Sequence, residues 1–170
     1  MNTSTLRKMK SRRLRVLLTK EQIENIKSEF SQWKDKMYAN KTLAERQDFG
    51  QFFTPPELTI KMLEKFQDLK GSVLDPTCGA GNLLAAAIMA GADPKLVYGI
   101  ELDPEILEIA RSRLEVLGVP KVNLHQGNAL YEECYNFSED YDYEKAVAKA
   151  EKRLAAPELP VTGFANFFKK

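Results

Sequence analysis

The chain has 170 residues, of which 44% are hydrophobic and 29% are charged, and its net charge is +1. These values predict one domain with a core and short extensions, and they exclude a global field that would attract a polyanion. Two cysteines and one histidine are too few for a disulfide framework or a zinc site, and thiols without partners favour a reducing cytoplasm. The apolar run Val16 to Leu18 is too short for a membrane span or a signal peptide. We therefore expect a cytoplasmic protein that binds neither metal nor membrane.

The N-terminal arm is strongly basic, because the first 20 residues contain seven bases and no acid. A block of like charge is often a solvated tail, but it can also lie on nucleic-acid phosphates and release their counterions. The composition leaves both alternatives open. The side chains that would contact a nucleic acid are Arg7, Lys8, Lys10, Arg12, Arg13 and Arg15.

Two helices are predicted before the first strand. Thr19 and Gln22 have the spacing of a capping box, and an apolar stripe at helical spacing continues to about Ala39. This stripe favours core packing, with a partner-binding helix as the alternative. A second helix should begin with Thr54 as N-cap and Pro55 at the first helical position. The two phenylalanines before Thr54 are typical of a core, with a ligand platform as the alternative.

Strands and helices then alternate along the chain. The predicted order is strand Ser72–Asp75, helix Asn82–Ala90, strand Lys95–Glu101, a helix that begins at Asp103-Pro104 and ends at Gly118, and strand Val122–Gln126. This order is typical of an α/β fold with a Rossmann-like, doubly wound parallel sheet. A further helix is expected over Glu144–Ala156.

Polar residues follow the three predicted strands at one edge of the sheet. Asp75, Glu101 and Asn128 stand at successive strand ends, and ligands of such sheets bind outside the carboxyl ends of the strands. Gly79 and Gly81 would let a ligand lie directly on the main chain. The turn lacks both the dinucleotide pattern and a phosphate-binding Gly-Lys-Ser/Thr, so it favours an adenosine ligand without phosphate. Asp75 would repel a pyrophosphate but can orient an ammonium group.

Four segments in this order resemble the S-adenosylmethionine-binding half of adenine-specific DNA methyltransferases. They are Gln51–Pro55, Asp75–Gly81, Gly99–Asp103 and Gln126–Leu130. With the Phe-Phe-Thr-Pro segment first, the order resembles the modification subunits of restriction-modification systems and their phage relatives. The resemblance covers residues 46–130 and implies a partial methyltransferase fold with S-adenosylmethionine as cofactor and DNA as a candidate partner. Residues 1–45 would form a basic arm and helix, and residues 131–170 an acidic, helical C-terminal extension.

The resemblance also implies which residues hold the cofactor. They are Phe53, Thr54, Pro55, Asp75, Thr77, Gly79, Gly81, Glu101, Leu102 and Asn128. The Phe-Thr-Pro residues would flank the methionine portion, and Asp75 with the two glycines would hold its amino-acid end. Glu101 would bind the ribose hydroxyls, and Leu102 would pack on the adenine. Asn128 stands where the family has an acid that contacts the adenine amino group, and a turn residue is the alternative reading.

The family's catalytic signature, Asn or Asp followed by Pro-Pro and an aromatic residue, does not follow Asn128. Asn166-Phe167-Phe168 has the asparagine and the aromatic rings without the prolines. We therefore assign no catalytic residue and expect a cofactor-binding chain that is inactive alone or one subunit of a split enzyme. The alternatives are a non-enzymatic remnant with a binding, regulatory or anti-restriction role, and a methyltransferase that acts on RNA or a small molecule.

Three strands would leave the first strand at an edge of the sheet. An unpaired apolar edge promotes aggregation. We therefore expect residues 160–168, a second copy of the chain or a separate chain with the missing strands to cover it.

Overall fold

The computed structural model describes residues 16–39, 42, 44, 52–66 and 68–155. The basic arm and Asn166–Phe168 lie outside the described residues, so the predictions made for them are not tested. The principal elements are α2 (Lys20–Ala39), α4 (Pro56–Leu63), β1 (Val73–Asp75), α5 (Asn82–Met89), β2 (Val97–Glu101), α6 (Pro104–Val116), β3 (Leu124–Gln126) and α7 (Tyr143–Leu154). Short 3-10 helices η1 (Pro94–Leu96), η2 (Lys121–Asn123) and η3 (Glu132–Tyr135) precede or follow the later strands.

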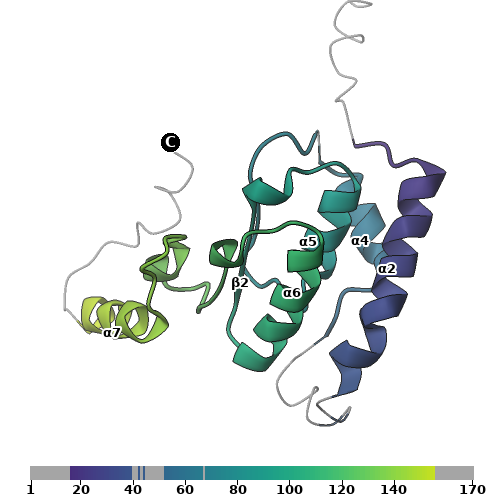
Figure 1. The fold of residues 1–170 in the computed structure, drawn as a ribbon. Coiled ribbons are helices and arrows are strands. Elements are labelled where there is room, and N and C mark those ends of the chain that lie inside the picture. The colour runs from purple at the N-terminus through teal and green to yellow at the C-terminus, as the bar shows by residue number, and fades with distance from the viewer. Residues whose placement is uncertain (1–15, 40–41, 43, 45–51, 67, 156–170) are drawn as a thin grey trace, which may run out of the picture.

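The sheet is parallel, with strand order β1-β2-β3, which confirms the expected Rossmann-like α/β fold. The chain crosses the sheet in one direction, and right-handed crossovers then place both connecting helices on the same face. In agreement, α5 contacts β1 and β2, α6 contacts β2 and β3, and the two helices contact each other. Helices α2 and α4 form an outer layer on α5, and α2 also contacts α6 (Figure 1).

The core on the helix side of the sheet is closely packed, and its tightest point is Gly99 in β2. A Cβ atom there would lie 2.9 Å from the Cys78 sulfur, 2.9 Å from a methyl group of Leu124 and 3.0 Å from one of Leu84. Glycine usually weakens a strand. Gly99 is needed at this position because α5 and the turn at Gly79 and Gly81 (the glycine turn) come so close to β2.

The opposite face of the sheet is covered by the aromatic segment after β3. The Phe137 ring lies 4.9 Å from the Tyr98 ring and 4.4 Å from the His125 ring, and Tyr141 stacks on His125 at 3.9 Å. The Tyr141 hydroxyl donates to the Gln126 carbonyl at 2.7 Å. The sequence showed no periodicity in this segment because irregular backbone, not a helix or strand, carries these rings.

Several predicted boundaries are wrong by a few residues. The strands predicted from Lys95 and Val122 begin only at Val97 and Leu124, because a 3-10 turn forms in front of each. The N-cap of α4 is Pro55, not Thr54, and the helix begins at Pro56. The predicted N-caps of α2 and α6 are confirmed. The Thr19 hydroxyl accepts from the Gln22 amide at 3.1 Å, and the Asp103 side chain accepts from two amides of α6.

Among the described residues, no helix has the length and apolar character needed to cross a membrane. The same part of the chain contains no cluster of three metal-ligating side chains. The division of the chain at residues 45 and 130 stays a prediction.

Candidate cofactor site

An open cleft lies at the carboxyl end of β1. The space between its walls is about 520 Å³ when the open mouth is included. It is lined by Phe52, Phe53, Thr54, Met62, Asp75, Thr77, Cys78, Gly79, Ala80, Asn82 and Leu83. The structure therefore brings together two segments that the sequence analysis had assigned to one ligand, the Phe-Phe-Thr segment and the glycine turn.

The two glycines of the turn have different structural reasons. Both have positive φ, 53° at Gly79 and 80° at Gly81, a conformation that favours glycine. Gly79 lines the cleft, and a Cβ there would lie 3.9 Å from the Phe53 ring. A Cβ at Gly81 would lie 2.9 Å from Leu114 of α6. The backbone conformation thus favours glycine at both positions, and Gly81 also lets α6 pack against the turn.

Asp75 ends β1 on the wall of the cleft. Its Oδ1 accepts a hydrogen bond from the Thr77 amide at 3.1 Å, which closes a tight turn. Burial raises the pKa of Asp75, the Thr77 amide acts in the opposite direction, and the Glu101 carboxylate raises it further. A carboxylate held in this way gains from a positively charged neighbour, so Asp75 suits an ammonium group.

Glu101 is fixed by the backbone at the end of β2. Its Oε2 accepts from the Gly79 amide at 2.9 Å, and its Oε1 accepts from the Asp103 amide at 2.9 Å. A carboxylate has about four acceptor positions, so these two bonds orient the group and leave capacity for two ligand hydroxyls. The same bonds tie the glycine turn to the start of α6.

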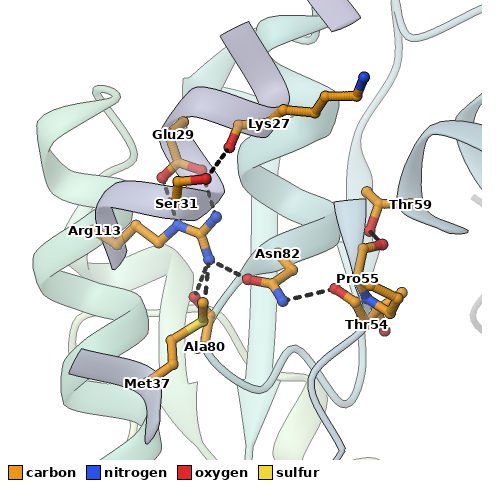
Figure 2. Close-up of polar contacts among 10 residues, drawn as sticks. All are labelled: Lys27, Glu29, Ser31, Met37, Thr54, Pro55, Thr59, Ala80, Asn82 and Arg113. Carbon is orange, nitrogen blue, oxygen red and sulfur yellow. Dashed lines mark hydrogen bonds and ion pairs between the residues drawn. The ribbon is translucent and has the colours of Figure 1, made fainter. Parts of the chain in front are cut away.

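Two neighbouring helices hold the Phe-Phe-Thr segment against the turn. The Phe53 ring meets the Tyr38 ring of α2 edge-on, with centroids 5.3 Å apart. The Asn82 side chain, in the first turn of α5, donates to the Thr54 carbonyl at 2.8 Å (Figure 2). Phe53 and Thr54 are therefore positioned by residues that precede and follow them in the chain.

Gly81, Glu101 and three further predicted cofactor residues stand outside the lining of the cleft. Pro55 is the N-cap of α4, and Leu102 is 54% exposed beyond β2. The Asn128 side chain accepts from the Leu130 amide at 3.0 Å, so it forms a turn after β3, and its oxygen keeps one free acceptor position. Their contacts with a cofactor stay predictions.

The sequence analysis missed several residues of the cleft. Met62 is 38% exposed although it lies on an apolar stripe, and Asn82 is the polar residue that opens an otherwise apolar helix. That exception was the available signal for Asn82. Cys78 also lines the cleft, but burial and the two nearby carboxylates raise the pKa of its thiol well above the usual value. Cys78 is therefore a packing residue and a poor nucleophile.

A family model described as a methyltransferase domain matches residues 67–163 of the chain. The chain belongs to this family. The match contains the glycine turn and both strand-end acids, while α2 and the Phe-Phe-Thr segment precede it. No solved structure matches the chain.

Curated relatives carry different methyltransferase names. The type II methyltransferase M.VspI of Vibrio sp. (strain 343) is 35% identical over 96 residues, which cover 55% of this chain and 23% of the relative. The ribosomal protein L11 methyltransferase of Clostridium botulinum (strain Alaska E43 / Type E3) is 30% identical over 103 residues, which cover 58% and 32%. The type II methyltransferase M.NspV of Nostoc sp. (strain ATCC 29411 / PCC 7524) is 31% identical over 84 residues, which cover 48% and 18%. The chain thus spans a third or less of these relatives.

S-adenosylmethionine is the cofactor that this family implies, and the cleft suits it. Asp75 on the wall of the cleft would orient the ammonium group of its amino-acid end, and Glu101, oriented by the Gly79 amide, would accept from its ribose hydroxyls. Phe53 and Met62 offer apolar surface beside them. When bound, the cofactor supplies a methyl group activated by a sulfonium. The residues of this chain contribute binding and orientation.

Proposed function

We propose that this chain is the cofactor-binding part of an adenine-specific DNA methyltransferase. It would bind S-adenosylmethionine and transfer the methyl group only when a further segment, in the same or another chain, supplies the groups that grip the flipped adenine. The observation that carries this proposal is the packing of Phe53 and Thr54 beside Gly79 in one cleft with Asp75. The Phe-Phe-Thr-Pro segment is the part of the sequence that resembles the DNA-modifying group.

The relatives support this proposal and also define its competitor. Two of them are named type II methyltransferases, in keeping with the resemblance to DNA-modifying enzymes. Another acts, by its name, on a ribosomal protein. The choice of methyl acceptor therefore needs a direct test.

Calorimetric titration with S-adenosylmethionine tests the site. Asp75→Ala and Glu101→Ala should each weaken binding about 10-fold or more, since each removes a charge-assisted contact of about 1.5–3 kcal/mol. Glu115→Ala, an exposed acid on α6, is the matched control and should bind like the unchanged chain. Absence of binding, or equal binding by all variants, would contradict the cofactor assignment.

Transfer of a labelled methyl group tests the acceptor. We expect the 170-residue chain to label neither duplex DNA, ribosomal RNA nor ribosomal protein by itself. When the chain is mixed with a protein that carries an Asn/Asp-Pro-Pro-aromatic segment, adenine in duplex DNA should become labelled. Labelling of DNA by the chain alone would contradict the proposal that it is incomplete, and labelling of RNA or protein would favour the competing acceptor.

A partner surface follows from the same proposal. Within the described residues, β1 pairs on one side only, with β2. Leu58, Met62 and Phe66, spaced four residues apart on and after α4, are all exposed. We propose that a strand of the segment that supplies the catalytic groups pairs with β1 and that this segment covers these apolar side chains. Light scattering at high protein concentration tests whether the chain stays a monomer, and hydrogen exchange tests whether the amides of β1 are protected. A monodisperse monomer whose β1 amides exchange freely would contradict the proposed pairing.

The basic arm is proposed to contact the DNA phosphates. Removal of residues 1–15 should weaken DNA binding by the assembled enzyme and reduce its salt dependence, because fewer counterions are released. Cofactor affinity should stay the same. Unchanged salt dependence would assign the arm to another role.

A further inference from the structure

A buried arginine connects the outer helix α2 to the cofactor cleft. Arg113 of α6 is 1% exposed, and its guanidinium faces Glu29 of α2. The Arg113 Nε donates to Glu29 Oε1 at 2.5 Å, and Nη2 donates to Oε2 (Figure 2). This two-pronged pairing uses the fork geometry that only arginine provides.

The remaining nitrogen of the same guanidinium reaches the glycine turn. Arg113 Nη1 donates to the Ala80 carbonyl at 3.0 Å and to the Asn82 side-chain oxygen. The amide nitrogen of Asn82 donates in turn to the Thr54 carbonyl at 2.8 Å. Figure 2 shows this chain of contacts running from Glu29 through Arg113 and Asn82 to Thr54. Ala80, Asn82 and Thr54 all line the cleft.

The orientation of Asn82 depends on Arg113. A guanidinium has donors and no acceptor, so Arg113 fixes the amide oxygen of Asn82 toward itself. The amide nitrogen must then face the Thr54 carbonyl, which can only accept. Without the guanidinium, the Asn82 amide loses the contact that sets its orientation, and the Phe53-Thr54 segment loses its link to α5.

Stability alone does not explain this arrangement. A buried ion pair is expensive to desolvate, and apolar residues of similar volume often replace such pairs without loss of stability. Glu29 stands on a helical stripe with the buried Ile26, and Arg113 on one with the buried Ala110, and apolar side chains usually occupy such positions. The use of charged residues at both positions is explained by what the third nitrogen of Arg113 holds.

We propose that Arg113 and Glu29 are positioning residues that set the affinity for S-adenosylmethionine. They hold the glycine turn and the Phe53-Thr54 segment in their binding arrangement, so that α2 belongs to the binding machinery. The inference rests on the proposed function. It also extends the site beyond the family match, which begins at residue 67.

The first test replaces the ion pair by an apolar pair, Glu29→Leu with Arg113→Met. Because the double variant leaves no buried charge unpaired, the full chain should have a higher melting temperature than the single variant Glu29→Ala, while its dissociation constant for S-adenosylmethionine rises about 10-fold or more. Residues 52–59 should also exchange their amide hydrogens faster in the absence of cofactor. A stable double variant with unchanged affinity and exchange would overturn the proposal.

A second pair of variants keeps the proposal testable if the double variant does not fold. Arg113→Lys keeps a charge for Glu29 but offers one compact ammonium, which cannot reach the carboxylate, Ala80 and Asn82 together. Leu107→Ala is the matched control, because it opens a cavity on the same helix without touching the network. At a temperature where both are folded, Arg113→Lys should bind about 10-fold more weakly, and Leu107→Ala should bind normally. Equal weakening by both variants would show that the network is merely structural and overturn the proposal.

The inference and the proposed function fail in different ways. If the unchanged chain does not bind S-adenosylmethionine, the proposed function is wrong. Hydrogen exchange in the absence of cofactor still tests whether Arg113 positions the glycine turn and the Phe53-Thr54 segment. Faster exchange at residues 52–59 and 79–83 in Arg113→Lys than in Leu107→Ala would support it, and equal exchange would overturn it.

Discussion

The two faces of the sheet are closed by different chemistry. On the helix side, the glycine turn and the cleft lie beside a buried ion pair, and charged or polar groups fix the geometry. On the other side, the Phe137 and Tyr141 rings pack against the rings of Tyr98 and His125. We infer that the first face is built for orientation and the second for burial. Changes on the first face should therefore alter cofactor affinity, and changes on the second should alter stability alone.

The largest effect is expected from unpairing the buried arginine. Glu29→Ala should lower the free energy of unfolding by about 3–5 kcal/mol, because Arg113 is left as an uncompensated buried charge. Glu24→Ala on the same helix removes an acid whose pair with Lys27 is exposed, and it should cost less than about 1 kcal/mol. Urea unfolding of both variants measures the difference. Similar losses of unfolding free energy in the two variants would mean that the buried ion pair is no more important for stability than an exposed one.

The next effect concerns the tight packing at Gly99. Gly99→Ala should cost about 1–3 kcal/mol, because its methyl group would overlap Cys78, Leu124 and Leu84. Gly71→Ala is the matched control, since no atom lies within 4 Å of a Cβ there. Its effect on urea unfolding should stay within about 0.5 kcal/mol. If both variants unfold at the same urea concentration, the packing of α5 against β2 tolerates a methyl group at residue 99 and the expectation is wrong.

The opposite face should make stability depend on pH through His125. The ring is 4% exposed, Nε2 lies 2.5 Å from the Cys134 carbonyl, and Nδ1 is buried without a hydrogen-bond partner. Burial lowers the pKa of His125, the Cys134 carbonyl acts in the opposite direction, and the charge of Arg111 lowers the pKa further. The unfolded chain then binds the proton more readily than the folded one. Stability is full above the ordinary pKa of 6.5 and falls as the pH decreases below it.

The loss should reach at most about 1.4 kcal/mol per pH unit, the limit for one proton. His125→Phe keeps a ring in the stack and removes the titrating group. Thermal unfolding of both proteins from pH 5.5 to 7.5 gives the contribution of His125 as their difference, in which the carboxyl groups cancel. A difference that does not change with pH would refute the expectation.

The smallest effect is expected at the end of the described chain. The Asp142 side chain accepts from the Lys145 amide at 3.0 Å and caps α7. Asp142→Ala should lower the melting temperature slightly, because α7 loses its N-cap, and it should leave the affinity for S-adenosylmethionine unchanged. Calorimetry of this variant tests whether the two faces act independently. A weaker affinity would show that they do not.

Much of the candidate site could be predicted from the sequence, because its signals are local. Asp75 and Glu101 follow short apolar strands, and glycines mark the turn between β1 and α5. Strand ends and turn residues are set by neighbours a few positions away. The predicted cap of α4 was wrong by one residue, and the Thr54 carbonyl accepts from Asn82, a contact 28 positions along the chain that has no local signal.

The sequence by itself determined the order of the elements, the parallel sheet and the chemistry at the strand ends. Only the tertiary structure decided that α2 is linked through Arg113 to the candidate cofactor cleft. Glu29 and Arg113 are 84 positions apart, and each stands on a stripe that predicts apolar packing. A charged residue on such a stripe has no local sign of its partner. The pairing becomes visible only when the fold places α2 against α6.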